Sequence, residues 1–234
     1  MLRHLLDGLA GKLPGQCAVC RAWPAQPVCD SCVARFAQPQ PRCRRCALPV
    51  PEGVAECGRC LREPPPLDAC HAGVGYGYPW SALITQFKFQ GQPGWARTFA
   101  TLMRRAPGLR AALGRADLVV PMPLSRERLA ERGFNQALLL ARSLDAGKAR
   151  AGVLLRVRHT PAQTALDRRG RLANVAGAFA VEPSQAASLR AKRVLLVDDV
   201  MTSGASVFGA AAALRQAGAA GVAAAVLART DAPA

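Results

Sequence analysis

The chain has 234 residues, half of them hydrophobic, and a formal net charge of +16 at pH 7. This length is enough for one substantial hydrophobic core and a small additional module. No apolar run approaches the roughly twenty residues that a membrane-spanning helix needs, so no such helix is predicted.

The positive charge is distributed unevenly along the chain. Up to Ala72 there are nine Lys and Arg against six Asp and Glu, whereas the remainder has twenty-two against nine. The second part therefore carries a net charge of +13, which favours a polyanionic partner: a pyrophosphate, a nucleic acid, or both. An arginine-rich composition typical of a genome rich in G and C is the alternative explanation.

The first thirteen residues are predicted to form a short amphipathic helix. Leu2, Leu5, Leu6 and Leu9 follow helical spacing and are expected to pack on the body of the protein. The segment lacks the long apolar core and the cleavage site of a signal peptide, which predicts a cytoplasmic location. In that reducing compartment, paired cysteines favour metal binding over disulfides.

Four Cys-x-x-Cys pairs follow in close succession. They are Cys17/Cys20, Cys29/Cys32, Cys43/Cys46 and Cys57/Cys60. Each pair can supply two thiolates to a tetrahedral zinc ion, so eight thiolates predict two structural Zn²⁺ sites in a zinc-ribbon module. Sequential and interleaved pairing both fit the spacing. A ninth cysteine, Cys70, stands alone and is interpreted as a packed thiol.

Basic and aromatic residues lie close to these cysteines. Arg42, Arg44 and Arg45 flank the third pair, and Trp23 and Phe36 are nearby. Such groups suit single-stranded nucleic acid. A solvated basic loop, with the aromatic side chains packed on the knuckles, fits the pattern equally well.

A proline-containing segment, Leu61–Ala72, is interpreted as a semi-rigid linker. The predicted domains are accordingly residues 1–66, with the helix and the zinc ribbon, and residues 67–234. From Gly73 onward the pattern is α/β. Strands are predicted at 74–78, 118–122, 153–157, 194–197 and 222–227, and helices at 80–89, 95–105, 137–144 and 205–217. Within the first of these helices, Lys88 could reach an anion, but it is interpreted as a snorkelling surface lysine.

A cluster of arginines follows the second predicted strand. Arg126, Arg128 and Arg132 begin where that strand ends, the edge at which open α/β sheets bind ligands. Arginine forks match phosphate oxygens, so contact with a pyrophosphate is favoured. The alternative is a charged amphipathic helix in which Glu127 and Glu131 pair with these arginines. Asn135 is expected to cap the next helix.

A long polar connection runs from Arg158 to Phe179 and includes Arg158, Gln163 and Arg171. Long connections between core strands are uncommon unless they are functional. We interpret this one as a lid over the substrate; a surface loop without a binding role is the alternative.

The most informative stretch is Val194–Ser206. A buried strand leads into Asp198 and Asp199, then into a turn with Thr202, Ser203, Gly204, Ala205 and Ser206, and then into a helix with Gly218 expected as its C-cap. The turn suits a sugar 5-phosphate at a helix N-terminus, and the carboxylates suit ribose hydroxyls or a divalent cation. A nucleotide-hydrolase site is excluded because neither Gly-Lys pair is followed by Ser or Thr.

This order of strand, acid pair and loop resembles the 5-phosphoribosyl-1-pyrophosphate (PRPP) motif of type I phosphoribosyltransferases. Together with the cysteine pairs, the Arg-Gly-Phe-Asn-Gln block and Gln163…Arg171…Asn174, the whole chain resembles the ComF/GntX family. The resemblance implies an α/β fold of the type I phosphoribosyltransferase class, a twisted parallel sheet flanked by helices, with an N-terminal zinc-ribbon module. Ser203 and Ser206 stand where relatives often carry threonine.

The resemblance also implies ligands and partners. PRPP with Mg²⁺ is expected at the carboxyl edge of the sheet, with the arginine cluster near the pyrophosphate and residues 158–174 as the flexible loop. Single-stranded DNA and other competence proteins are the expected partners, in DNA uptake. The main alternative is an active phosphoribosyltransferase acting on an unidentified nitrogen acceptor, although no general base for an acceptor stands out and the catalytic residues are unassigned.

Overall fold

A computed structural model describes residues 15–23, 25–157 and 177–231. Two expected elements, the N-terminal helix and the lid with Arg158, Gln163 and Arg171, lie outside the described residues. The chain divides into two compact units, Met1–Gln38 and Pro39–Ala234. The boundary at residues 66 and 67 stays a prediction about sequence modules, since the compact units divide earlier.

In order, the described elements are α2 (Asp30–Phe36), α3 (Gly58–Arg62), β1 (Ala69–Gly75), α4 (Trp80–Phe89), α5 (Trp95–Arg104), α6 (Leu109–Arg115), β2 (Leu118–Pro121), α7 (Arg126–Arg132), α8 (Gln136–Leu144), β3 (Leu154–Arg156), β4 (Phe179–Val181), η2 (Pro183–Gln185), α10 (Ala186–Leu189), β5 (Arg193–Met201), α11 (Ala205–Gln216) and β6 (Gly221–Arg229). From β1 onward, most of the described strands are separated by one or more helices.

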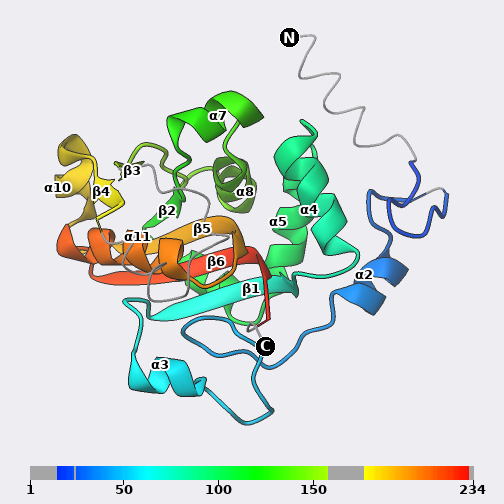
Figure 1. The fold of residues 1–234 in the computed structure, drawn as a ribbon, viewed down its shortest axis with the longest axis horizontal. Coiled ribbons are helices and arrows are strands. Elements are labelled where there is room, and N and C mark those ends of the chain that lie inside the picture. The colour runs from blue at the N-terminus through cyan, green and yellow to red at the C-terminus, as the bar shows by residue number, and fades with distance from the viewer. Residues whose placement is uncertain (1–14, 24, 158–176, 232–234) are drawn as a thin grey trace. The chain divides into compact units, whose positions relative to one another are not determined.

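The centre of the larger unit is a four-stranded parallel sheet in the order β1-β6-β5-β2 (Figure 1). The parallel sheet expected from the sequence is confirmed. The predicted strand at 153–157 forms instead a separate antiparallel pair, β3 with β4. Because parallel strands end at the same edge, the loops after β1, β2 and β5 share one side of the sheet.

One prediction about the linker is wrong. Strand β1 begins at Ala69 and ends at Gly75, whereas the sequence suggested a strand at 74–78 preceded by a linker through Ala72. Alternate residues of β1 are buried, and Ala69 to Ala72 pair with Ala223 to Val226 of β6. Small residues at an edge strand carry a weak hydrophobic signal, which explains the missed start.

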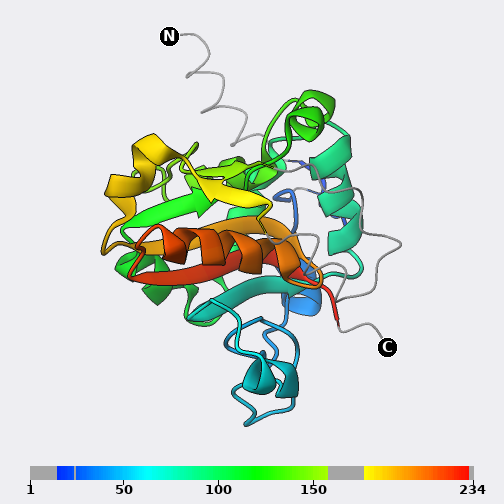
Figure 2. The same ribbon diagram turned by 60° about the vertical axis from the view of Figure 1, so that its left-hand side comes forward.

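Helices cover both faces of the sheet. Helices α5 and α8 pack against each other and against the strands, whereas α11 packs on β5 and β6 together with β4 (Figure 2). On β5, Val194 and Leu196 belong to the buried cluster that includes α11. Their neighbours Leu195 and Val197 are also buried. Burial of alternate residues on two faces explains why this strand reads as a continuous apolar run.

The ends of the site-bearing helices match the sequence closely. Asn135 accepts a hydrogen bond from the Leu138 N–H at 3.1 Å, which confirms the predicted cap of α8. Gly218 has a φ of 94° just after α11, and the Ala219 N–H reaches the Leu214 carbonyl at 3.1 Å. The predicted glycine at the C-terminal end of α11 is therefore confirmed.

Candidate functional site

The turn after β5 leads directly into the N-terminus of α11. The first N–H groups of a helix lack partners within it, so they are available to an anion. Ser203 Oγ accepts from the Ala205 N–H at 3.3 Å and stabilises the turn. Asp198, Val200 and residues 201–207 line a hollow of about 60 Å³. The turn thus combines hydroxyl groups, a helix N-terminus and open space.

Gly204 is required by the geometry of this turn. Its φ is 86°, a conformation that favours glycine. A Cβ atom at this position would lie 2.6 Å from Met201 Cε and 2.7 Å from the Phe208 ring. Only a residue without a side chain allows the chain to pass this close to Met201 and Phe208.

The two carboxylates lie within β5 rather than beyond its end. The strand continues to Met201, and Asp198 and Val200 are in register with Val226 and Ala228 of β6. Burial, followed by the neighbouring charge of Asp199, raises the pKa of Asp198 to about 7, against the lowering effect of Lys88. An acid pair held this way is poised to accept hydrogen bonds or a cation.

Lys88 pairs with the second carboxylate of the acid pair. Its Nζ lies 2.9 Å from Asp199 Oδ1, and both side chains are mostly buried. The interpretation of Lys88 as a surface lysine is therefore wrong. The signal was present in the sequence, because Lys88 stands between Phe87, which is fully buried, and Phe89.

The arginine cluster forms α7, as the helical alternative proposed. Ser125 caps this helix by accepting from the Arg128 N–H at 3.4 Å. Arg126 is exposed, whereas Arg128 and Arg132 are half-buried. The charge of Arg132 lowers the pKa of Asp198, against the larger effect of burial, so α7 acts on the acid pair electrostatically.

Arg132 is fixed by two neighbours at this edge, Phe89 and Gln136. Its guanidinium lies 4.9 Å from the centre of the Phe89 ring, and Nη1 donates to Gln136 Oε1 at 3.2 Å. Gln136, itself buried, donates from Nε2 to the Lys88 carbonyl at 3.4 Å. The buried Nε of Arg132 has no hydrogen-bond partner among the described residues. A donor of this kind is available for an incoming anion.

Besides Lys88 and the arginines of α7, a further cation, which the sequence did not predict, acts on the acid pair. Arg156 on β3 is affected electrostatically by Asp198, Glu127 and Arg128, and burial lowers its pKa. Its guanidinium lies 5.7 Å from the centre of the Phe179 ring. Its only sequence signal was its place in a predicted strand.

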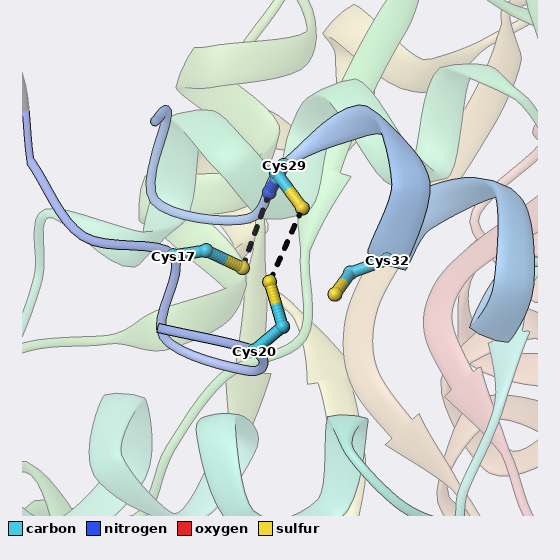
Figure 3. Close-up of side chains that lie close together, drawn as sticks. All are labelled: Cys17, Cys20, Cys29 and Cys32. Atoms are coloured by element: carbon cyan, nitrogen blue, oxygen red, sulfur yellow. Dashed lines mark hydrogen bonds between the residues drawn. The ribbon is translucent and has the colours of Figure 1, made fainter. Parts of the chain in front are cut away.

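The eight paired cysteines form two clusters in sequential order. Cys17, Cys20, Cys29 and Cys32 form the first quartet, and Cys43, Cys46, Cys57 and Cys60 form the second. Within each quartet all sulfur atoms lie within 4.8 Å of one another, and Figure 3 shows those of the first quartet facing a common centre. Sequential pairing is the arrangement found.

The sulfur geometry fits a metal rather than disulfides. Cys20 and Cys29 have sulfur atoms 3.6 Å apart, and those of Cys46 and Cys57 are 3.7 Å apart. A disulfide needs about 2.05 Å, whereas ligands about 2.3 Å from a tetrahedral zinc lie about 3.8 Å apart. Each quartet can therefore hold a metal ion, with four thiolates filling its coordination.

The two quartets share one local design. In each, the first pair lies in a knuckle, closed by Arg21 N–H to Cys17 O at 2.9 Å and by Ala47 N–H to Cys43 O at 2.8 Å. The residue that follows each knuckle has a positive φ, 63° at Arg21 and 54° at Ala47. The second pair begins a short helix, α2 or α3. The module is a structural repeat.

The second quartet is part of the hydrophobic core of the larger unit. All four of its cysteines are buried and belong to the cluster that includes β1, β5, β6 and α11. In the first quartet, by contrast, Cys20 is exposed. Cys70 is buried within the same core, and burial raises its pKa to about 12, which confirms that it is a packed thiol.

The arginines near the third cysteine pair have partners within the protein. Arg44 Nε and Arg45 Nε share Glu56, at 2.5 and 3.0 Å, and Arg42 Nη1 donates to the Ala47 carbonyl at 2.9 Å. These contacts favour the structural alternative for Arg42 and Arg45, whereas the Arg44 side chain remains 62% exposed.

Comparisons with known proteins agree with this architecture. A family model described as "Phosphoribosyl transferase domain" matches residues 129–234. The chain is 35% identical to competence protein F of Haemophilus influenzae over 168 residues, which cover 68% of this chain and 72% of that protein. It is 33% identical to the DNA utilization protein YhgH of Salmonella typhimurium over 231 residues, 93% of this chain and 98% of that protein.

A third relative extends the same pattern. The DNA utilization protein YhgH of Escherichia coli K12 is 33% identical over 181 residues, which cover 73% of this chain and 76% of that protein. The parallel sheet flanked by helices is the fold that a phosphoribosyl transferase domain requires, and the two cysteine quartets fit a zinc-ribbon module. Because these relatives match it over most or nearly all of their length, the chain belongs to the ComF family.

Proposed function

We propose that this protein binds PRPP, together with Mg²⁺, at the carboxyl edge of its parallel sheet. The observation that carries the proposal is the sequence of groups along one segment: an acid pair on β5, a hydroxyl-rich turn with Gly204, and the N-terminus of α11. A sugar phosphate has hydroxyls at one end and a phosphate at the other, and this segment offers matching groups in the same order.

Each part of PRPP has a proposed partner. The 5-phosphate binds at the turn. Backbone N–H groups of residues 202–206, including Gly204 and Ala205, and the hydroxyls of Thr202, Ser203 and Ser206 donate hydrogen bonds to it. The ribose hydroxyls take Asp198 and Asp199. The pyrophosphate takes α7, where Arg132 has a buried donor without a partner among the described residues. Arg126 and Arg128 on α7, and Arg158, Gln163 and Arg171 from the predicted lid, remain proposed pyrophosphate contacts.

Metal ions complete the proposal. Mg²⁺ prefers oxygen ligands, and Asp198 and Asp199, together with the phosphates of PRPP, offer that chemistry. When bound, Mg²⁺ neutralises charge on the pyrophosphate. The two cysteine quartets hold Zn²⁺ in structural sites, because four thiolates leave no open coordination position.

A thermal-shift comparison tests the PRPP proposal by chemical parts. With Mg²⁺ present, PRPP should raise the melting temperature more than ribose 5-phosphate does, because only PRPP reaches α7. An Arg132→Met variant should reduce this difference while keeping the response to ribose 5-phosphate. Equal responses to PRPP and ribose 5-phosphate in the wild type would remove the pyrophosphate part of the proposal.

We further propose a role in DNA uptake or use, in contact with single-stranded DNA in the cytoplasm. The names of the relatives include competence and DNA utilization. Tyr76 and Tyr78, which directly follow β1, are 42% and 71% exposed, and Phe89 is 58% exposed. Exposed aromatic rings suit the stacking of unpaired bases, and the Phe89 ring lies beside Arg132. Other competence proteins are proposed partners on the same grounds.

DNA binding has its own test. Affinity for single-stranded DNA should fall steeply with salt, because the second part of the chain carries a net charge of +13. A Tyr76→Ala/Tyr78→Ala variant should bind about tenfold or more weakly, given about 1–3 kcal/mol per stacked base. The control is Leu61→Ala on α3, an exposed apolar side chain without an aromatic ring, which should leave DNA binding unchanged. No binding at low salt would end this proposal.

The alternative function is catalysis of phosphoribosyl transfer. The matched phosphoribosyl transferase domain supports it. A nitrogen acceptor would form a bond to the anomeric carbon as pyrophosphate departs, with the acceptor's proton released to water. Pyrophosphate release from PRPP, measured with amines, nucleobases and DNA ends as acceptors, decides between a transferase and a binding protein.

A further inference from the structure

Arg229, the last residue of β6, is a buried arginine that joins two parts of the larger unit. Its side chain is 2% exposed. Nε donates to the carbonyl of Cys46 at 2.9 Å. Nη1 donates to the carbonyls of Met201 at 3.1 Å and Thr202 at 2.5 Å. A single guanidinium therefore connects the second cysteine quartet with the first residues of the phosphate turn.

The charge of Arg229 is unusual for its surroundings. Burial of a cation is costly unless an anion compensates it. The hydrogen-bond acceptors of Arg229 are carbonyl and hydroxyl oxygens of Cys46, Met201, Thr202 and Thr230, not carboxylates. Four thiolates around one Zn²⁺ carry a net charge of −2. The second quartet, when loaded, supplies the negative charge that Arg229 lacks.

A second contact path runs parallel to the first. The Cys70 N–H donates to the carbonyl of Arg44, inside the knuckle of the second quartet, at 2.7 Å. Cys70 Sγ lies 3.7 Å from Met201 Sδ. The Met201 side chain packs beneath Gly204, where it occupies the space a Cβ would need. The turn thus rests on the second quartet through both Arg229 and Cys70.

We infer that Arg229 is a positioning residue through which metal at the second quartet holds the phosphate turn in its binding conformation. The inference rests on the proposed PRPP function for its consequence: loading of the second quartet raises the affinity for PRPP, and loading of the first quartet leaves it unchanged. Coupling between two sites is reciprocal, so bound PRPP must also retain metal at the second quartet.

Metal release from otherwise intact protein tests this coupling. The Cys17→Ser/Cys20→Ser variant leaves the second quartet as the four-cysteine site. Zinc release to a chromogenic chelator is followed at constant Mg²⁺, with and without saturating PRPP. We expect PRPP to slow the release by about fivefold or more, as coupled sites usually show. Bound PRPP with an unchanged release rate would overturn the inference.

Two variants separate coupling from simple damage. The matched control is Cys46→Ser/Cys60→Ser, which leaves only the first quartet. With PRPP raised until its binding to this variant saturates, PRPP should not alter zinc release. Arg229→Lys keeps the charge but loses the fork, so it should keep zinc bound while PRPP slows its release much less than in the wild type. Slowing of the wild-type size in Arg229→Lys would show that Arg229 is not the connection.

A measurement without PRPP keeps this inference distinct from the proposed function. Hydrogen exchange of a peptide spanning residues 201–207 is compared between zinc-loaded Arg229→Lys and the zinc-loaded wild type. We expect at least tenfold faster exchange in the variant. Equal exchange would contradict the positioning role even if PRPP binds, and faster exchange would support it even if PRPP does not bind.

Discussion

Lys88 and Asp199 form an ion pair, with Nζ 2.9 Å from Oδ1, that joins the last turn of α4 to the acid pair of β5. The same end of α4 contacts α8, since Gln136 donates to the Lys88 carbonyl at 3.4 Å. Three segments far apart in the sequence therefore meet at the candidate ribose site. Lys88 thus supplies a positive charge in direct contact with one of these carboxylates.

Removal of Lys88 should destabilise the protein. A Lys88→Met variant leaves Asp199 buried without its cation. We expect a loss of about 3 kcal/mol in the free energy of unfolding at pH 8, the lower end for a buried pair, because 18% of the Lys88 side chain is exposed. Lys88→Arg should recover part of this loss. The matched control is Lys192→Met, because Lys192 lies 3.9 Å from Asp117 and both are well exposed; its effect should stay below about 0.5 kcal/mol. Equal effects in urea unfolding would contradict the assignment.

Neutralising Asp198 should stabilise the protein in a pH-dependent way. Burial, then Asp199, raises its pKa from 3.8 to about 7, so the unfolded chain ionises first as the pH rises. The folded state therefore loses relative stability between about pH 4 and pH 7. At pH 8 the free energy of unfolding of Asp198→Asn should exceed that of the wild type by about 1–2 kcal/mol, and this difference should disappear by pH 4. Urea unfolding across this pH range measures the stability difference between the variant and the wild type. A difference that is constant with pH, or of the opposite sign, would refute the prediction.

A side chain at Gly204 should damage both stability and binding. Gly204→Ala places a Cβ 2.6 Å from Met201 at a φ of 86°, and we expect a loss of about 1–3 kcal/mol together with weaker PRPP binding. Gly91→Ala is the matched control, because Gly91 has a φ of 61° but open space around it. That control should lose about 1 kcal/mol and bind PRPP normally. Normal PRPP affinity in Gly204→Ala would argue against the turn as the binding site of the 5-phosphate.

Metal content should follow the two quartets independently. Elemental analysis should give two zinc ions per wild-type chain, and one in either Cys17→Ser/Cys20→Ser or Cys46→Ser/Cys60→Ser. Loss of the second quartet should lower the melting temperature of the larger unit, because its cysteines belong to that unit's core. Loss of the first quartet should change it little. Retention of both zinc ions in either variant would contradict the assigned ligands.

Much of the fold followed from patterns along the chain. The buried strand of β5, the cap at Asn135, the glycine after α11 and the cysteine pairs all depend on nearby residues, and these predictions are confirmed. The start of β1 was missed because its small residues gain stability from β6, a partner near the other end of the chain.

The candidate site was predicted where it depends on neighbouring residues and missed where it depends on distant ones. Asp198, Asp199 and the turn lie within one segment, so their order is visible in the sequence. The roles of Lys88, Arg156 and Arg229 arise only when segments far apart meet, through Asp199, Asp198 and Thr202 respectively. The pairing of the cysteines was also open, because spacing fits either arrangement and only the folded chain separates them into two clusters.

PRPP binding at β5 and α11 is the central claim, and calorimetric titration tests it most directly. PRPP is titrated with Mg²⁺ into the wild type and into an Asp198→Asn/Asp199→Asn variant whose zinc content and folding have been checked. We predict a clear one-site isotherm for the wild type and at least a tenfold weaker one for the variant. Identical isotherms for the two proteins, or no heat of binding in the wild type, would contradict the claim.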